Sequence, residues 1–254
     1  LAPGINDSDG DGNVTVHGSR ERDLKVTVDG VSNVDPLTGQ RLSQINPDAI
    51  EEIEIIDTGA DLSMGGAVGG YARITIKSGG NAFEGSAALF WVDPALNNDG
   101  AGGRDLAPFS RRKPSVYVSG PIVKDRLWYL LTAEATQATT PINVLGGPDA
   151  TVELRGRTEL GKITWQAGHQ HRLALQYSAD PLTLEPLGVS TLVPADSASD
   201  YRQGGPTYSL NWLVTNSPTS VWESTLAFSD VEYGYKPHNP LARNTCASGT
   251  VIGI

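Results

Sequence analysis

The sequence lacks the features on which membrane helices, disulfides and secretion signals depend. It contains no run of about 18 apolar residues, which excludes a transmembrane helix. The only cysteine, Cys246, is either an unpaired loop thiol or the partner of a cysteine outside the chain. The start, LAPGIND, has neither the charged nor the apolar region of a signal peptide, so we expect a mature form or a chain that begins within a longer protein.

Basic residues are also scarce. The chain has 19 Lys and Arg against 29 Asp and Glu, which gives a formal net charge of −10. Binding to nucleic-acid phosphates requires clustered Lys and Arg, and no basic stripe occurs here. The sequence therefore predicts no nucleic-acid partner.

Catalytic motifs are missing as well. The sequence has no H-E-x-x-H, G-x-S-x-G or Cys/His constellation, and no G-x-x-x-x-G-K-[ST] phosphate loop. His169 and His171 could contact one metal ion from a strand face, but they fall in a predicted tight turn, where a solvated setting is expected. We therefore predict that the chain is not an enzyme.

Turn formers are abundant, with 29 Gly and 16 Pro, and this composition favours an all-β fold. The first 82 residues contain short stretches of strand character separated by Gly and Asp turns. Between them, residues 46–52 (NPDAIEE) predict one helical turn, with Asn46 as cap and Pro47 at the first helical position. The expected strands are 13–18, 24–31, 53–57 and 71–78.

Glycines in this part predict turns and close backbone contacts. Asp29–Gly30 is a favoured pair for a tight turn. A second group permits positive φ and close approach of the backbone, as a compact domain inside a narrow lumen would need. This group consists of Gly65, Gly66, Gly69 and Gly70.

From Phe83 onward, large apolar and small polar residues alternate, which is the period of a strand with two different faces. In residues 207–214, for example, Tyr208, Leu210 and Trp212 share one face and Ser209 lies on the other. Similar alternation occurs in 126–135, 161–166, 171–178 and 221–229. The predicted strands are 83–92, 114–121, 126–137, 153–166, 171–180, 204–214 and 220–235.

The connections between these strands distinguish a membrane barrel from a soluble sandwich. Short turns at 122–125, 167–170 and 215–219 alternate with long loops near 93–113, 138–152 and 181–203. Outer-membrane barrels have this pattern, with short periplasmic turns and long extracellular loops. Five tryptophans lie on the strands, as expected for aromatic girdles at the two membrane interfaces. They are Trp91, Trp128, Trp165, Trp212 and Trp222.

The predicted fold is therefore mainly β. Residues 1–82 would form a small mixed α/β domain, and residues 83–254 would supply about seven antiparallel strands of an incomplete transmembrane β-barrel. An open sheet of seven strands would leave edge amides unpaired in lipid, so we expect further polypeptide to complete the barrel.

Several stretches resemble TonB-dependent outer-membrane receptors, and more closely their Oar-like branch. LAPGI (1–5), VTVHGSR (14–20) and VTVDGVSNVDPLTG (26–39) are similar to elements of the later part of the receptor plug. Residues 45–86 resemble the plug signature that leads through K-S-G-x-N-x-F-x-G-S into the barrel. PIVKDRLWYLLTAE (121–134) is similar to the second barrel hairpin.

The resemblance implies a plug within a barrel, in the outer membrane of a Gram-negative bacterium, and gated uptake or export of a substrate. Implied partners are outer-membrane lipid, the remaining barrel polypeptide, the TonB system and a peptide, protein or glycan substrate. The TonB box and the first part of the plug are not in the sequence, and His17 stands where much of the wider family has Arg. The alternative is a receptor-derived structural or interaction subunit of a larger outer-membrane assembly, without its own transport.

One acidic segment, DSDGDGN, has the spacing of a calcium loop. Asp7, Asp9 and Asp11 occupy the first, third and fifth positions, and Gly12 the sixth, where a sharp turn is needed. With Asn13 these side chains form a candidate oxygen ligand set for calcium, the only cofactor that the sequence suggests. The twelfth position is Gly18 instead of a bidentate Glu, so the alternative is a plain acidic loop.

Overall fold

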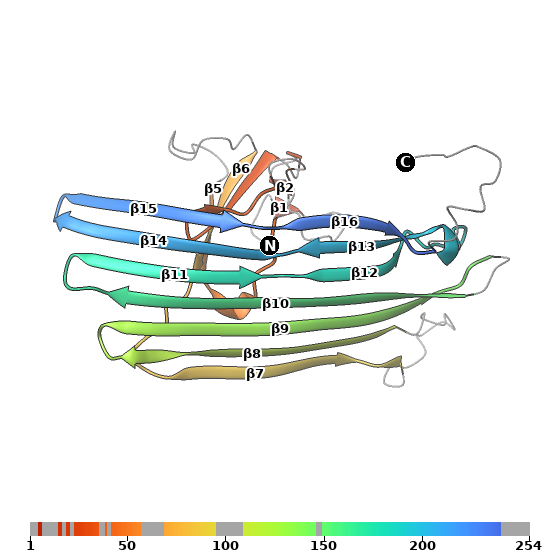
Figure 1. Cartoon of the computed structure of the whole chain (residues 1–254), viewed down its shortest axis with the longest axis horizontal. Helices are drawn as coiled ribbons and strands as arrows, with labels where there is room; N and C mark the ends of the chain where they lie inside the picture. Colours follow the sequence, from red (N-terminus) through yellow and green to blue (C-terminus); the bar gives the residue numbers. More distant parts are fainter. Residues whose placement is uncertain are drawn as a thin grey trace.

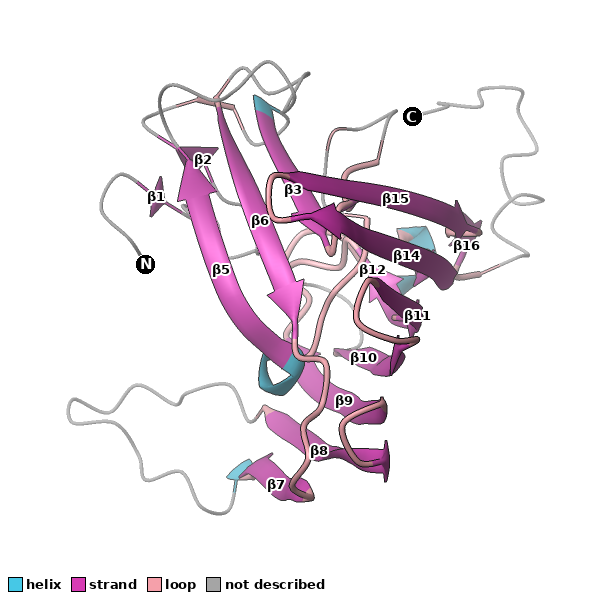
Figure 2. Cartoon of the chain, turned by 90° about the vertical axis from the view of Figure 1, so that its left-hand side faces the viewer, coloured by secondary structure: helices cyan, strands magenta, loops and turns pink. Residues whose placement is uncertain are grey.

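The computed structural model describes residues 5–6, 15–16, 19–20, 23–35, 39, 42–56, 69–94, 109–145 and 149–239. These residues form a broad sheet of long strands, with a small sheet packed against one of its faces (Figures 1 and 2). Within the same residues, no helix is both long enough and apolar enough to cross a membrane.

The small sheet has four strands in the order β4-β3-β6-β5. β3 and β6 are parallel, and the other two pairs are antiparallel. As predicted, Asp29 and Gly30 make the tight turn between β3 and β4, with φ values of 45° and 82°. The strand bounds are β3 Leu24–Val28, β4 Val31–Ser32, β5 Ile50–Ile56 and β6 Gly70–Ile76. A separate pair consists of β1 (Ile5–Asn6) and β2 (Thr15–Val16).

The predicted helical turn is present but shorter than expected. Pro47–Ala49 form a single 3-10 turn, and Asn46 Oδ1 accepts a hydrogen bond from Asp48 N at 2.9 Å. Strand β5 begins at Ile50, which pairs with Ile76. Residues 50–52 are therefore in a strand because pairing with β6 replaces continuation of the turn.

All strand pairs of the large sheet are antiparallel. The bounds are β7 Glu84–Val92, β8 Ser110–Val123, β9 Leu127–Ile142, β10 Ala150–Gln166, β11 His171–Ala179, β12 Leu182–Leu187, β13 Ser199–Gly204, β14 Pro206–Ser217, β15 Ser220–Ser229 and β16 Glu232–Pro237.

Six of these strands form three longer strands, each interrupted once. β11 and β12 both pair with β10 in the same register, and β13–β14 and β15–β16 continue across their own interruptions. The interruptions at 180–181, 205 and 230–231 lie side by side. Gly205 is required there because a Cβ would collide with the carbonyl oxygen of Asp230. The described part of the large sheet therefore makes seven passes, as the sequence predicts.

The predicted long loop at 181–203 is wrong in part, because it contains β12 and β13. The chain leaves the sheet only between Leu187 and Ser199, where Ala195–Ser197 form a second 3-10 turn. The alternation on which the prediction rests changes phase here. In β11 the apolar Leu173 and Leu175 share the face opposite the small sheet, whereas in β12 the apolar Leu182 and Leu184 share the face toward it.

The core lies between the two sheets. Ile76 of the small sheet and Leu130 of the large sheet are fully buried, and they belong to one apolar cluster with Val28, Ala49, Tyr117 and Leu160. Burial of an apolar side chain of this kind contributes about 1.5–3 kcal/mol. A few such side chains therefore hold the small sheet against the large one.

Candidate functional site

The face of the large sheet that covers the small sheet is lined mainly by small polar side chains. These alternate with the apolar side chains of the opposite face, as the period-2 pattern predicts. The buried polar residues on this inner face include Ser119, Thr132, Thr158, Thr164, Gln176 and Ser209. The contact between the two sheets is thus a limited apolar cluster surrounded by polar groups.

A buried ion pair joins the sheets near their centre. Lys162 of β10 donates from Nζ to Asp29 Oδ2 and to the carbonyl oxygen of Ile76, both at 2.8 Å. The other carboxylate oxygen of Asp29 accepts a hydrogen bond from Ile76 N at 3.1 Å. Because Lys162 is only 5% exposed, losing the carboxylate would leave its charge buried without compensation.

A second polar contact links the sheets close to the interruptions. Gln44 N, in the segment before the 3-10 turn, donates to Asp180 Oδ2 at 2.7 Å.

Nearer the start of the chain, Arg20 donates to Asp23 at the entry to β3, and this hydrogen bond raises the pKa of Arg20 above its ordinary value.

The segment between β6 and β7 is attached to the short turn between β8 and β9. Asn81 Oδ1 accepts hydrogen bonds from Asp125 N at 2.9 Å and from Trp128 Nε1 at 2.8 Å. Gly79 has φ 73° and approaches the carbonyl oxygen of Tyr129 so closely that a Cβ would collide with it. These contacts fix the point at which the chain passes from one sheet to the other.

Beyond the interruptions, the inner face carries aromatic and charged side chains. Tyr201 and Tyr235 lie with ring centroids 4.9 Å apart, and Tyr201 Oη donates to Gln203 Oε1 at 2.8 Å. On neighbouring strands, Lys113 Nζ lies 2.9 Å from Glu134 Oε1. A cavity of about 120 Å³ lies beside this ion pair and beside Asp180.

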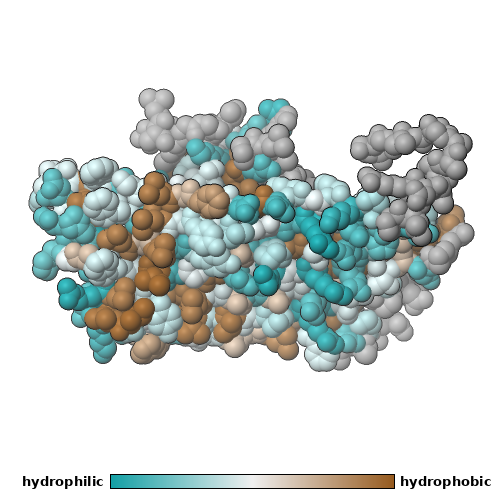
Figure 3. Space-filling model, in the orientation of Figure 1, coloured by the Kyte–Doolittle hydropathy of each residue, from teal (hydrophilic) through white to brown (hydrophobic). Residues whose placement is uncertain are grey.

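The opposite face of the large sheet carries an exposed apolar band. Leu226 is 70% exposed and Leu175 53% exposed, although both are strongly apolar. In Figure 3, apolar side chains gather over the left part of this face and polar ones over the right part. An apolar band on the outer face of an antiparallel sheet is the pattern expected of the lipid-facing surface of a transmembrane barrel.

Aromatic side chains border this band on both sides. Near the short turns, Trp212 lies 6.2 Å from Trp222 and 5.9 Å from His171, with Trp165 also exposed. On the side of the long loops, the rings of Tyr177 and Tyr208 lie 5.3 Å apart. Arg112 lies over the ring of Trp91. Such girdles are expected at the two membrane interfaces.

The prediction that all five tryptophans belong to girdles is wrong for Trp128. This residue pairs with the fully buried Thr164, so it lies on the inner face, where it donates to Asn81. Its indole N–H therefore helps to hold the connecting segment and does not lie at a membrane interface.

The candidate calcium residues lie outside the described residues, as do Cys246, His17, Gly65 and Gly66. Among the residues that the structure does describe, no group of three or more His, Cys, Asp or Glu side chains could hold a metal ion. His169 lies in the predicted turn and His171 begins β11, where its ring stacks on Trp212. His238 Nδ1 lies 2.6 Å from Asp200 Oδ1.

Comparison with known proteins relates the small sheet to a family. Residues 2–71 match the family described as TonB-dependent Receptor Plug Domain. The chain is 26% identical over 251 residues to the TonB-dependent transporter Oar of Myxococcus xanthus, an alignment that covers 92% of this chain and 23% of Oar.

Solved structures share the fold at lower identity. The siderophore receptor PirA from Pseudomonas aeruginosa is 18% identical, with a TM-score of 0.64, and the match covers 92% of this chain and 36% of PirA. The outer membrane transporter YddB from Escherichia coli is 17% identical, with a TM-score of 0.61 and coverage of 85% and 32%. The chain thus spans about a quarter of Oar and about a third of these two structures.

The sequence matches, the fold and the apolar outer band agree with one another. They place the chain in the outer membrane of a Gram-negative bacterium. Together they support a fragment of a TonB-dependent outer-membrane receptor, with plug sequence at residues 2–71 followed by strands similar to those of the barrel.

Proposed function

We propose that the chain forms the plug and part of the channel wall of a receptor that moves a substrate through the outer membrane by TonB-driven, gated uptake or export. The division into a plug at 1–82 and a barrel wall at 83–254 is part of this proposal. The observation that carries it is the contact between plug and wall, where a small apolar cluster and a few polar contacts join two separate sheets.

A contact of this kind is suited to gating. Water can replace hydrogen bonds between polar side chains at modest cost, whereas it cannot replace apolar packing. The inner wall consists largely of Ser, Thr and Gln side chains, so a path opened beside the plug would be lined by polar groups. The Lys162–Asp29 pair would hold the closed position until the plug is pulled.

Peptides, proteins and glycans are the proposed substrate classes. The inner face beyond the interruptions supports the choice of these substrate classes. Its tyrosines, Tyr201, Tyr233 and Tyr235, offer flat apolar rings together with hydroxyl groups. The neighbouring Lys113–Glu134 pair adds charged hydrogen-bonding groups of both signs. Such a surface can stack on a sugar ring or an aromatic side chain and also bind its polar groups.

The test is uptake by whole cells that carry the complete receptor. Fluorescent peptide and glycan pools should accumulate in the periplasm of cells with the receptor and TonB, and not when either gene is deleted. The double variant Tyr201→Ala, Tyr235→Ala should reduce accumulation, whereas Tyr208→Ala on the outer face should not. Accumulation that is unchanged without the receptor would reject transport and favour the alternative, a structural subunit of a larger outer-membrane assembly.

A further inference from the structure

The plug is attached to the wall unequally on its two sides. Among the described residues, the wall members of the buried apolar cluster come from β8, β9 and β10, as Tyr117, Leu130 and Leu160. The segment after β6 is held on the same side, where Asn81 accepts a hydrogen bond from the turn between β8 and β9. Because water cannot replace apolar packing, these three strands form the stronger attachment of the plug.

On its other side the plug faces β11 and β14, which carry polar side chains there. A cavity of about 20 Å³ lies between the plug and these strands, and they contribute only uncharged polar residues to its lining. Four wall residues form this polar seam: Gln176, Ser178, Thr207 and Ser209. Within the described part of the chain, no hydrogen bond or ion pair joins the four to the plug, and Gln176 Oε1 is buried without a partner. Water therefore enters the polar seam at little cost.

The plug segment that faces the polar seam is bound to itself. Asn33 donates from Nδ2 to the carbonyl oxygen of Ser43 at 3.0 Å, and its Oδ1 accepts from Ser43 N at 3.0 Å and from Ser43 Oγ at 2.8 Å. Asn33 N also donates to the carbonyl oxygen of Val26 in β3 at 2.8 Å. The segment can therefore leave the wall with its own hydrogen bonds intact.

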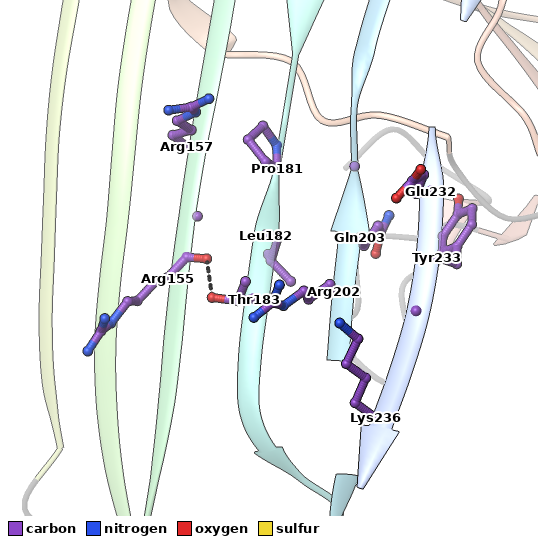
Figure 4. A pocket seen from close by; sticks show the side chains of 13 residues that line it. Arg155, Arg157, Pro181, Leu182, Thr183, Arg202, Gln203, Glu232, Tyr233 and Lys236 are labelled. Atoms are coloured by element: carbon purple, nitrogen blue, oxygen red, sulfur yellow. Dashed lines mark hydrogen bonds between the residues drawn. The ribbon is translucent and has the colours of Figure 1, made fainter. Parts of the chain in front are cut away.

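Two polar contacts lie at the ends of the polar seam. The buried ion pair between the sheets lies at one end, because Lys162 pairs with Gln176 in the large sheet. The hydrogen bond from Gln44 to Asp180 lies at the other end. In Figure 4 the plug chain crosses behind the strands near Pro181, the next residue. Loss of these two contacts would free this side of the plug and leave the apolar cluster in place.

We propose that the substrate path opens along the polar seam, as the plug separates from β11 and β14 and stays seated on β8, β9 and β10. The inference rests on the proposed function and adds the side of the plug on which the path lies. An extended substrate that crosses there meets hydroxyl and amide groups, which both donate and accept hydrogen bonds. The polar seam is thus the wall surface that a moving substrate contacts.

The experiment compares two buried serines of the inner face in cells that carry the complete receptor without other cysteines. Ser209→Cys lies in the polar seam, where Ser209 is 7% exposed, and Ser119→Cys lies beside Tyr117 of the apolar cluster, where Ser119 is 1% exposed. A membrane-impermeant maleimide is added while the cells take up the peptide and glycan pools. TonB should raise the labelling rate of Ser209→Cys on the order of ten-fold, because it increases the population of the open state. Ser119→Cys should stay unlabelled.

A second pair of variants tests the path without a label. The double variant Thr207→Val, Ser209→Ala makes the polar seam more apolar and should lower accumulation of the pools several-fold, because the passing substrate loses hydrogen-bonding partners. The double variant Thr132→Val, Ser119→Ala makes the same change among buried residues of β8 and β9 and should leave accumulation unchanged.

Equal TonB-dependent labelling of the two cysteines would overturn the inference, because the whole plug would then leave the wall. Labelling of Ser119→Cys alone would also overturn it, by placing the path on the other side. Normal accumulation with neither cysteine labelled would place the path inside the plug and reject the polar seam. Labelling and accumulation that are the same without TonB would reject the proposed function itself.

Discussion

At the scale of single residues, Lys162 shows what tertiary structure adds to the sequence. The sequence pattern places it on the polar face of a strand, which is correct, but its partner Asp29 lies 133 residues away in the plug. Strand periodicity gives the face on which a residue lies and does not give its partner across two sheets. The Asp29–Gly30 turn was predictable because its geometry depends on two adjacent residues.

We expect Asp29→Asn to destabilise the contact between plug and wall by about 3 kcal/mol, because the charge of Lys162 would remain buried without its carboxylate. The measurement is hydrogen exchange in β6 of the complete receptor, where Ile76 N loses a charged acceptor. The double variant Asp29→Asn, Lys162→Met removes both charges and should regain most of the protection. Equal exchange in the wild type and the single variant would show that the pair does not hold the plug.

The calcium loop stays a prediction at the same scale. If Asp7, Asp9, Asp11 and Asn13 are ligands, calcium titration by calorimetry should give binding heat that the double variant Asp9→Ala, Asp11→Ala lacks. Replacement of Asp48, an acidic residue within the 3-10 turn, serves as the control. Identical heats from the wild type and the double variant would leave an acidic solvated loop.

At the scale of elements, the seven passes of the wall were predictable and their lengths were not. Within the apolar band, one face of each strand is apolar and the other polar, so alternation is a strong signal. Beyond the band the two faces exchange roles, since Thr183 and Arg202 lie outside while Leu182 and Tyr201 lie inside. The alternation with an apolar outer face ends at this exchange, and the sequence pattern therefore predicts loops where the ends of the long strands lie.

The interruptions themselves can be tested at Gly205. An Ala there should cost about 1 to 3 kcal/mol, because its Cβ would collide with the Asp230 carbonyl oxygen and push β14 and β15 apart. Gly234→Ala adds the same methyl group where there is open space and should cost almost nothing. The urea dependence of unfolding of the complete receptor in lipid vesicles gives both values. Similar stability of the two variants would mean that the chain relaxes easily at Gly205.

At the scale of the whole molecule, the long and short connections and the exposed apolar band together describe a wall in a bilayer. The sequence predicted this architecture, because the outside of such a barrel repeats one simple requirement on every strand. The sequence could not locate the plug contacts, because they are made by residues that are neighbours in space and distant in the chain.

A charged substitution within the apolar band tests whether the band lies in lipid. Leu226→Arg places a charge in the middle of the apolar band and should cost about 2–4 kcal/mol of folding free energy in lipid vesicles. Thr151→Arg lies on the outer face of β10 far from the band, and its cost should be near zero. Heat-dependent gel mobility over a urea series measures both. Equal costs at the two positions would mean that the band does not lie in lipid.

The exchange of faces at the strand interruptions has one more consequence. The pleat of the sheet continues without a shift, yet the side that prefers hydrocarbon changes from outside to inside. The positions at which apolar side chains change from the outer to the inner face therefore mark the level at which the membrane ends. A rigid sheet marked in this way cannot slide along the bilayer normal without exposing Leu175 to water or drawing Arg157 into hydrocarbon, so the interruptions set the depth at which the barrel sits.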